Sequence, residues 1–320
     1  MKTGILLLNL GGPDTPDAVR PFLTRLFTDR EIIQLPGGPL GQAILGRAIA
    51  WMRTREVKEN YARIGGGSPI VRWTTLQGRG LVERLRARGH DVAFALAMRY
   101  WDPNTDQALG EVERAGVERL LALTLYPHYS MATTGSSVAE LERVMKQRGT
   151  KLPLDRIDVW YDHPGYLDAL AHRARVALDV HFKDRRPTLL VSAHGLPKHF
   201  IEAGDPYIDH IRVTMEGLLS RLPDLPHVLG YQSRVGPVEW IGPSTDQVIR
   251  DLARAGVEDV LVIPISFVSD HVETLYEIDL LYGDQARALG VRNFRRAESL
   301  NDFPPFLDAL ADLVEPKLRS

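Results

Sequence analysis

An internal repeat is the feature that most constrains the fold of this chain. Residues 103–125 match residues 243–265 at about ten of 23 aligned positions, with a constant offset of 140 residues. The same offset aligns the segment YLDALA at 166–171 with FLDALA at 306–311. Two homologous halves are the simplest account of this repeat, so we expect two similar domains.

Each copy of the repeat predicts a helix followed by a buried strand. Thr105 and Thr245 stand where a helix N-cap is expected, at the start of an apolar stripe with a period of 3.6 residues. The apolar segments that follow, 120–126 and 260–267, suit a parallel sheet covered by helices on both faces. Similar segments complete four strands per half, at 5–10, 92–98 and 157–161 and then at 189–193, 228–232 and 293–297.

Strands that alternate with helices in this way predict the fold class. We expect α/β architecture, with two similar doubly wound, Rossmann-like domains that each contain a parallel four-stranded sheet. Ligands of such sheets bind beyond the carboxyl ends of the strands. We therefore expect the functional residues at the carboxyl ends of the strands.

The composition narrows the classes of partner. A formal net charge of −2 and a pI near 6.6 give no general attraction for nucleic acid. The absence of cysteine excludes disulfides, thiolate metal sites and iron–sulfur clusters, so any metal must bind nitrogen or oxygen ligands. No run reaches the roughly 18–20 apolar residues of a membrane span, and MKTGILLLNLGG reads as a buried strand rather than a signal peptide. We expect a cytoplasmic protein.

His194 follows a buried strand of the second half. Gly195 and Pro197 come directly after it, so the imidazole should project from the edge of the sheet. A hydrogen-bonded turn histidine with a structural role is the alternative.

The segment 270–277 places three acids and an imidazole directly after an apolar strand. If a helix begins near His271, then Glu273 and Glu277 are four residues apart and share one face. A divalent cation would remove their repulsion, and nitrogen and oxygen donors suit iron, zinc, cobalt or magnesium. A solvated helix face with a capped start is the alternative. The first half has Thr133 and Ser137 at the positions of the two glutamates.

Other segments offer ligand contacts of lower specificity. Arg99 ends a buried strand and Arg63 precedes the glycine turn at 64–70, so either arginine could pair with a ligand carboxylate or form a surface ion pair. The glycine turn lacks the Gly-Lys-Ser/Thr of a phosphate loop, and close approach to another surface is the better interpretation. Trp240 lies among glycines and prolines, and 35–52 is apolar; each suits either a cleft wall or ordinary packing.

Several strings, taken in order, resemble the ferrochelatase family over essentially the whole chain. They are LNLGGPDTP, LFTDR, YARIGGGSPI, YPHYSMATTGSS, SAHGLP, GDPY, YQSRVGPVEWIGPSTD, SFVSDHVETLYEID and RRAESLN. No single string suffices, but their order and spacing are specific. The resemblance implies a lyase that inserts Fe²⁺ into protoporphyrin IX to form protohaem in haem biosynthesis.

The resemblance also implies an architecture and a set of partners. It implies an open porphyrin cleft between two chelatase-type domains, with a first domain of 1–150 plus a C-terminal helix at 304–320. The second domain, 151–303, is expected to carry the catalytic residues. Porphyrin and ferrous iron are expected as substrates, with no permanently bound cofactor, and the chain is expected to be a monomer. A weak peripheral membrane contact through 35–52 is left open.

The family's site residues can be carried over to matching positions. His194 and Glu273 match the catalytic histidine and carboxylate, and both are expected to contact the metal. Glu277 matches the next metal-binding member of an acidic row, while Asp270 and His271 match supporting or structural partners. The following residues match porphyrin-contacting positions: Leu10, Arg63, Arg99, Tyr100, Trp240 and Phe267.

Two departures from the family pattern bear on specificity. Leu281 stands where the acidic row often continues, which argues against an outer metal site. Leu10 stands where some relatives that metallate coproporphyrin carry a tyrosine, which favours protoporphyrin. The alternatives are a coproporphyrin III ferrochelatase that forms coprohaem, a cobalt or nickel tetrapyrrole chelatase, and a porphyrin carrier.

Overall fold

The chain folds into two compact units. The computed structural model describes residues 1–234, 236 and 238–319. Unit 1 comprises Met1–Val159 and Leu310–Ser320, and unit 2 comprises Trp160–Ala309. The division follows Val159, where the sequence predicted 150, and helix α11 (Pro304–Arg319) supplies residues to both units.

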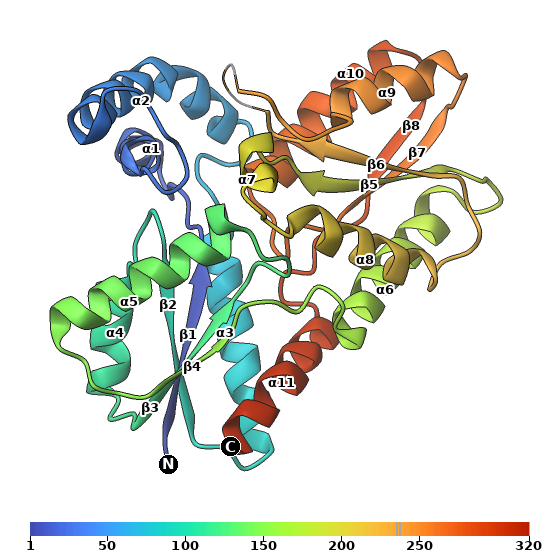
Figure 1. The fold of residues 1–320 in the computed structure, drawn as a ribbon. Coiled ribbons are helices and arrows are strands. Elements are labelled where there is room, and N and C mark those ends of the chain that lie inside the picture. The colour runs from blue at the N-terminus through green and yellow to red at the C-terminus, as the bar shows by residue number, and fades with distance from the viewer. Residues whose placement is uncertain (235, 237, 320) are drawn as a thin grey trace. The chain divides into compact units, whose positions relative to one another are not determined.

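Unit 1 is built on a parallel sheet with the strand order β2-β1-β3-β4. The strands are β1 (Thr3–Asn9), β2 (Val92–Met98), β3 (Arg119–Thr124) and β4 (Leu154–Ile157). The helices are α1 (Val19–Thr28), α2 (Gly38–Ala62), α3 (Ile70–Ala87), α4 (Thr105–Arg114) and α5 (Ser136–Arg148), with a 3₁₀ turn η1 (Pro16–Ala18) and a short π-helix η2 (Met131–Gly135). Helix α3 covers one face of the sheet, and α4 and α5 cover the other (Figure 1). Strands β1 and β3 are therefore buried throughout.

Unit 2 repeats this plan with the strand order β6-β5-β7-β8, again parallel. The strands are β5 (Thr188–His194), β6 (His227–Gln232), β7 (Asp259–Pro264) and β8 (Asn293–Arg296). The helices are α6 (Pro164–His181), α7 (Lys198–Glu202), α8 (Tyr207–Leu219), α9 (Thr245–Arg254) and α10 (Gly283–Ala288), with a π-helix η3 (Glu273–Tyr282) before α10. Helices α9 and α10 lie on one face of the sheet, and α6 and α8 on the other (Figure 1).

The two units confirm the predicted duplication. Their strand orders correspond one to one, and the offset of 140 residues relates β3 to β7 and α4 to α9 without a shift. Each sheet has its own apolar core, which includes Leu8, Val112 and Leu141 in unit 1 and Leu190 and Ile278 in unit 2. The fold is therefore a pair of doubly wound α/β units with parallel four-stranded sheets.

Two local predictions were wrong. The N-caps of α4 and α9 are Asn104 and Ser244, one residue before the predicted threonines, because their side chains accept the backbone N–H of Gln107 and Gln247. The last strand of the first half is Leu154–Ile157 instead of 157–161. It is an edge strand, and because Asp155 and Arg156 are exposed it lacks the apolar run that marks the other strands.

The glycine turn makes the close approach that the sequence predicted. A Cβ atom on Gly67 would lie 2.2 Å from the backbone oxygen of Asp14, so no larger residue fits there without movement of the backbone. The backbone N–H of Ser68 donates to the carbonyl of Pro13 at 2.7 Å. The turn thus joins the start of α3 to the loop after β1.

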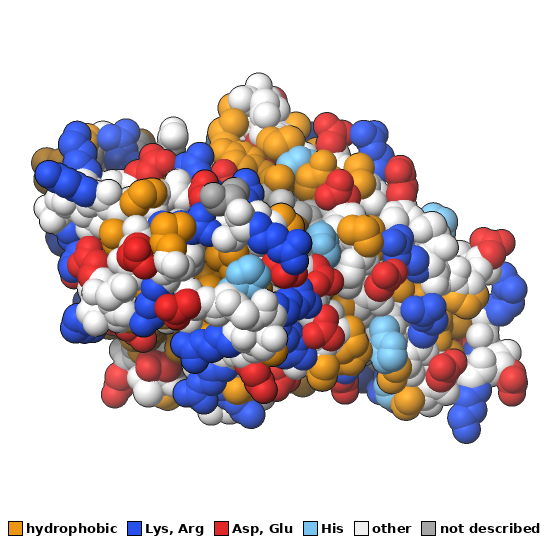
Figure 2. All heavy atoms as spheres, turned by 90° about the horizontal axis from the view of Figure 1, so that it is seen from below, with side chains coloured by type: hydrophobic (Ala, Val, Ile, Leu, Met, Phe, Trp, Pro, Cys, Tyr) orange, Lys and Arg blue, Asp and Glu red, His pale blue; other side chains and the backbone are white. Residues whose placement is uncertain are grey.

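Charged side chains of both signs are interspersed on the surface. Figure 2 shows lysine and arginine mixed with aspartate and glutamate over the face in view, with apolar side chains between them. This mixture accords with the small net charge of −2. Among the described residues, no helix is both long enough and apolar enough to cross a bilayer.

Candidate active site

The carboxyl edge of the unit 2 sheet gathers the polar residues that the sequence singled out. His194 is the last residue of β5 and pairs in register with Gln232, the last residue of β6. Strand β7 ends at Pro264 and continues through a loop into η3, which begins at Glu273. Parallel strands bring these chain segments to one edge, as the sequence predicted.

The backbone of His194 is held on both sides by hydrogen bonds. Its N–H donates to Oγ of Ser266 at 3.1 Å, and its carbonyl accepts from the hydroxyl of Tyr207 at 3.0 Å. The two hydroxyls of Tyr207 and Ser266 lie 2.8 Å apart. The ring of Phe267 packs edge-on against the imidazole, with the centroids 5.7 Å apart. The orientation of His194 is thus fixed by its surroundings.

The imidazole of His194 has one buried and one accessible side. Its Nδ1 atom is buried and has no hydrogen-bond partner in the part of the chain that the structure describes. That atom lies 3.8 Å from Oε1 of Glu273, beyond hydrogen-bond distance. About a third of the side chain is exposed (33%), so a ligand can reach other ring atoms. Burial lowers the pKa of His194, and nearby Glu273 opposes this shift only in part, so the ring is neutral near pH 7.

His271 and Glu273 form a buried ion pair. Nδ1 of His271 lies 3.0 Å from the carbonyl oxygen of Ser269, and Nε2 contacts Oε2 of Glu273. Both ring nitrogens of His271 thus face acceptor oxygens, which fixes the orientation of the ring. Burial alone would raise the pKa of Glu273, but His271 first and His194 second outweigh it and hold that pKa at about 2. Glu273 is therefore an anion at neutral pH.

The two glutamates lie on a helix, the arrangement that the sequence analysis considered, and this helix is a π-helix. In η3 the backbone follows an i→i+5 hydrogen-bond pattern, which is rare and is frequent at functional sites. Oε2 of Glu277 accepts from Oγ of Ser233 at 2.6 Å and from Nε2 of Gln232 at 3.3 Å. The same Nε2 donates to the backbone oxygen of Glu273 at 2.9 Å. Burial, reinforced by the negative charge of Glu273, raises the pKa of Glu277 to about 7.

Asp270 is a structural anchor beside this cluster. Its carboxylate accepts hydrogen bonds from Thr274 at 3.0 Å, Ser299 at 2.7 Å and Asn301 at 2.8 Å. Arg296 contributes an ion pair at 3.0 Å. Burial would raise the pKa of Asp270, but Arg296 and the three donors outweigh it and lower that pKa.

Four supporting residues were missed as site residues by the sequence reasoning. Gln232 and Ser233 lie within the string YQSRVGPVEWIGPSTD, and Arg296 lies within RRAESLN, so the strings themselves carried the signal. Asp279 follows Glu277 by two residues in the acidic segment. Their role became visible only when their partners, distant in sequence, were known.

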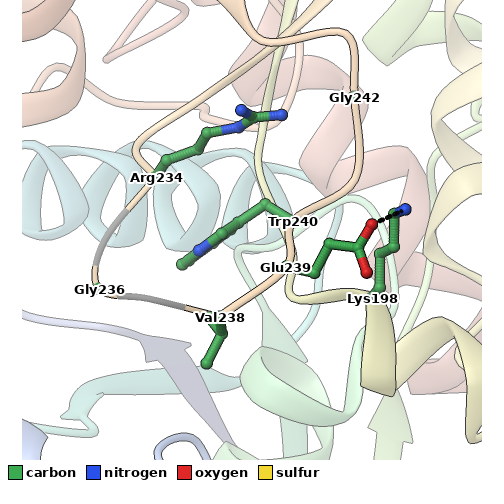
Figure 3. Close-up of a pocket in the computed structure, with 7 residues that line it drawn as sticks. All are labelled: Lys198, Arg234, Gly236, Val238, Glu239, Trp240 and Gly242. Carbon is green, nitrogen blue, oxygen red and sulfur yellow. Dashed lines mark hydrogen bonds and ion pairs between the residues drawn. The ribbon is translucent and has the colours of Figure 1, made fainter.

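Trp240 packs beside the end of β5. A Cβ atom on Gly195 would lie 3.1 Å from the indole ring and 2.7 Å from the backbone oxygen of Gln232, so glycine is what allows this contact. Pro197 and Trp240 also form an antiparallel bridge. An open pocket of about 640 Å³ adjoins the indole, and Figure 3 shows the loop that lines it, with Lys198 paired to Glu239. The described residues that line it are Lys198, Arg234, Gly236, Val238, Glu239, Trp240 and Gly242.

The other predicted contact residues belong to unit 1. Leu10 is half-buried directly after β1, and its carbonyl accepts the backbone N–H of Tyr100 at 3.0 Å. Tyr100 is buried and donates its hydroxyl to Asp29 at 2.8 Å. Arg99 also contacts Asp29 and donates to Oγ of Ser136 at 2.9 Å. In this structure both side chains are engaged with Asp29, and a porphyrin contact for them stays a prediction.

Arg63 lies at the exposed end of α2, where it forms the C-cap. Among the described residues, no group of three or more His, Asp or Glu side chains is arranged to hold a metal ion. Metal contacts of His194, Glu273 and Glu277 therefore stay predictions.

Comparison with known proteins identifies the family. A family model described as ferrochelatase matches residues 2–318. The chain belongs to the ferrochelatase family. A ferrochelatase of Citrifermentans bemidjiense is 49% identical over 315 residues, which cover 98% of each chain. A ferrochelatase of Geotalea uraniireducens is 47% identical and covers 100% of this chain and 99% of its own, and one of Synechococcus sp. is 45% identical and has 83% of its length covered.

Solved structures of chelatases share the fold of this ferrochelatase-family chain. SirB from Bacillus subtilis with Fe³⁺ gives a TM-score of 0.58 at 12% identity, covering 99% of this chain and 96% of its own. The sirohydrochlorin chelatase SirB in complex with cobalt gives 0.54 at 10% identity, covering 100% and 96%. At these identities the likeness shows the fold alone. A pair of α/β units, each built on a parallel sheet, is thus an architecture that solved metal chelatases share.

As a ferrochelatase-family enzyme, the chain has a site suited to proton transfer. It combines a neutral imidazole that has an accessible side, a carboxylate that stays ionised, and a second carboxyl group with a pKa near neutrality. Groups whose environments drive their pKa values apart can accept and pass on protons. The ring of Phe267 adds an apolar wall beside the imidazole.

Proposed function

We propose that this enzyme inserts Fe²⁺ into protoporphyrin IX to form protohaem, and that His194 and Glu273 carry the reaction. The observation on which this proposal depends is the pairing of a neutral imidazole with an ionised carboxylate at the edge of a sheet. Membership of the ferrochelatase family supplies the reaction class. Iron and porphyrin are substrates in this proposal.

The chemical task is the removal of two pyrrole N–H protons as the metal enters the ring. His194 accepts a proton at an exposed ring atom, because its Nδ1 atom is buried next to Glu273. The new imidazolium then gains an ion pair with Glu273, which makes protonation more favourable. Glu277 is placed to exchange protons near pH 7, since its pKa is about 7.

The porphyrin itself must be held while its nitrogens are exposed to the metal. Phe267 and Trp240 are half-buried aromatic residues, and they suit contact with a flat apolar ring. Phe267 packs against the ring of His194, and Trp240 packs beside Gly195. Binding energy from the periphery of the macrocycle can offset its distortion at the centre.

The choice of protoporphyrin rests on Leu10. This residue occupies the position where some relatives that act on coproporphyrin have a tyrosine, and its side chain offers no oxygen ligand for iron. A coproporphyrin III ferrochelatase that forms coprohaem is the second candidate.

The test is a steady-state insertion assay with the purified full chain. Fe²⁺ is supplied anaerobically with protoporphyrin IX or coproporphyrin III, and Co²⁺ with sirohydrochlorin serves as a third arm. The proposal expects kcat/KM to be highest for protoporphyrin IX. A higher kcat/KM for coproporphyrin III would reject protoporphyrin IX as the substrate in favour of coproporphyrin III. Turnover of sirohydrochlorin alone would reject insertion of iron into a porphyrin as the reaction. Tight binding of haem without turnover would indicate a carrier.

We also propose a weak contact between helix α2 and an anionic lipid surface on the cytoplasmic side. Five large apolar side chains of α2 are exposed: Leu40 at 72%, Ile44 at 60%, Leu45 at 38%, Trp51 at 65% and Met52 at 63%. The helix also carries four basic residues against two acids, which complements anionic headgroups. Exposed apolar residues next to positive charge are typical of interfacial helices.

Sedimentation with liposomes tests this contact. The double variant Ile44→Ser/Trp51→Ser should lose binding to vesicles that contain 30% anionic lipid, and Leu289→Ser, an exposed leucine of unit 2, should retain it. Equal sedimentation of the double variant and wild type would reject the proposal. Light scattering of the same protein variants without vesicles reports whether the chain is a monomer, as we propose, or whether the α2 face joins two copies.

A further inference from the structure

Arg296 holds two carboxylates with one guanidinium. It lies at the end of β8, and only 10% of its side chain is exposed. Nε and Nη2 donate to the two oxygens of Asp279, both at 2.8 Å. Nη1 lies 3.0 Å from Oδ1 of Asp270 and donates to Oγ of Ser299 at 3.1 Å. A buried guanidinium with this many short contacts is fixed in position.

Asp270 connects the guanidinium to the chain before the π-helix. Its backbone N–H donates to Oδ1 of Asn301 at 2.8 Å, while its carboxylate accepts from Nδ2 of Asn301 and from Oγ1 of Thr274. The residue is thereby held by both its backbone and its side chain. Asp279, by contrast, lies within η3 itself.

The two carboxylates that Arg296 binds flank the two glutamates of the site. Asp270 precedes Glu273 by three residues, and Asp279 follows Glu277 by two residues. Between them the backbone adopts the π-helical pattern that brings Glu273 to His271 and Glu277 to Ser233. A shift of this helix by one residue would move both carboxylates away from these partners.

We propose that Arg296 is a positioning residue for metal insertion, which clamps η3 in the register that holds Glu273 beside His194. This inference rests on the proposed function of that pair. Arg296 acts through Asp270 and Asp279. The two bonds to Asp279 require a planar fork of donors, so lysine cannot replace arginine although it keeps the charge.

The test compares Arg296→Lys with Arg295→Lys. Arg295 is the preceding residue of β8 and is exposed, so the control makes the same change next to the clamp. We expect Arg296→Lys to lower kcat by about 10-fold or more while the KM for porphyrin stays within about twofold, since small displacements of catalytic groups are costly. Arg295→Lys should match wild type in both constants.

A second measurement reports the clamp without reference to turnover. Hydrogen–deuterium exchange of residues 273–282 should be faster in Arg296→Lys than in wild type and unchanged in Arg295→Lys. If Arg296→Lys does not fold, Asp279→Asn decides, because this partly exposed carboxylate (36%) can be neutralised while Asp270 keeps its ion pair. Asp279→Asn should also speed exchange in that segment.

The outcomes separate this inference from the proposed function. Wild-type kcat together with wild-type exchange of 273–282 in Arg296→Lys would overturn the clamp. If the wild-type enzyme metallates no porphyrin, the proposed function fails, and the exchange measurement still decides whether Arg296 holds η3. A fall in kcat without faster exchange would also reject it, because the effect would then not pass through the helix.

Discussion

The Nδ1 atom of His194 lies 3.8 Å from Oε1 of Glu273, which is too far for a hydrogen bond and close enough for an ion pair. With a neutral imidazole the contact is loose. Once His194 gains a proton, the attraction between opposite charges favours a shorter contact. In the proposed mechanism, this geometry would stabilise the protonated form of His194 when a proton leaves the porphyrin.

Replacement of the histidine should abolish metal insertion. We expect His194→Ala to lower kcat by about 10²- to 10⁴-fold, the usual range for loss of a general base. The thermal unfolding transition should stay close to that of wild type, because the backbone of residue 194 keeps its bonds to Ser266 and Tyr207. His227→Ala, which changes an exposed histidine at the opposite end of β6, is the control. Activity of His194→Ala at the control level would end the assignment.

Removal of the Glu273 charge should separate binding from turnover. We expect Glu273→Gln to keep its affinity for porphyrin, measured by fluorescence quenching, and to lose about 10²-fold or more in kcat. The change removes the carboxylate oxygen that faces Nε2 of the buried His271, so a stability loss of about 1–3 kcal/mol is also expected. Glu202→Gln, at an exposed glutamate of α7, should alter neither property. Wild-type rates in Glu273→Gln would contradict the proposed mechanism.

Glu277 should make the stability of the protein depend on pH in a definite direction. Its pKa is about 7 in the folded state against 4.5 ordinarily, so the folded state binds more protons between these values. Its contribution to stability is therefore complete below about pH 4.5 and is lost as the pH rises through 7. Glu277→Gln should be more stable than wild type at pH 8 by up to about 3 kcal/mol, and close to wild type at pH 4.5. Urea unfolding at both pH values checks this, and equal differences at the two would refute it.

Gly195 should not tolerate a methyl group. The Cβ of Gly195→Ala would lie 2.7 Å from the backbone oxygen of Gln232 and 3.1 Å from Trp240, so we expect a loss of about 1–3 kcal/mol and weaker porphyrin binding. Gly110→Ala in α4 is the matched control, since its nearest neighbours are the ends of arginine side chains at 3.5 Å or more. The control should be neutral or more stable by about 0.5–1 kcal/mol. Similar stabilities of the two variants would contradict the prediction, because they would show that the neighbours of Gly195 move to accept the methyl group at no cost.

The fold could be predicted from the sequence because the internal repeat indicates two domains of the same topology. A constant offset over a helix and a strand leaves little freedom for the topology, and the site followed from where the strands end. His194 and Glu273 could be placed at one edge because both follow apolar strands. The porphyrin-contacting roles of Leu10, Arg63 and Trp240 stay predictions.

Local detail was harder because the deciding partners are distant in sequence. The sequence suggested a helix that begins near His271, but it did not indicate the π-helical pattern of residues 273–282. Arg296 and Gln232, which contact this helix, are distant from it in sequence, and no periodicity reveals such contacts. His271 was predicted to be a supporting residue, and its ion pair with Glu273 depends on a side-chain orientation set by Ser269.

The duplicated architecture has a consequence for how such a site can arise or be transferred. The positions concerned in the second half are Asp270, His271, Glu273, Glu277 and Asp279. Their equivalents at the offset of 140 residues are Ser130, Met131, Thr133, Ser137 and Ala139. An acid introduced alone into the first half would be an uncompensated charge in a protein interior, which is strongly destabilising. The first half already has an arginine, Arg156, at the position equivalent to Arg296. Transfer of the proposed site into that half would thus require the acids and the imidazole to be moved together, so that each acid keeps its partners.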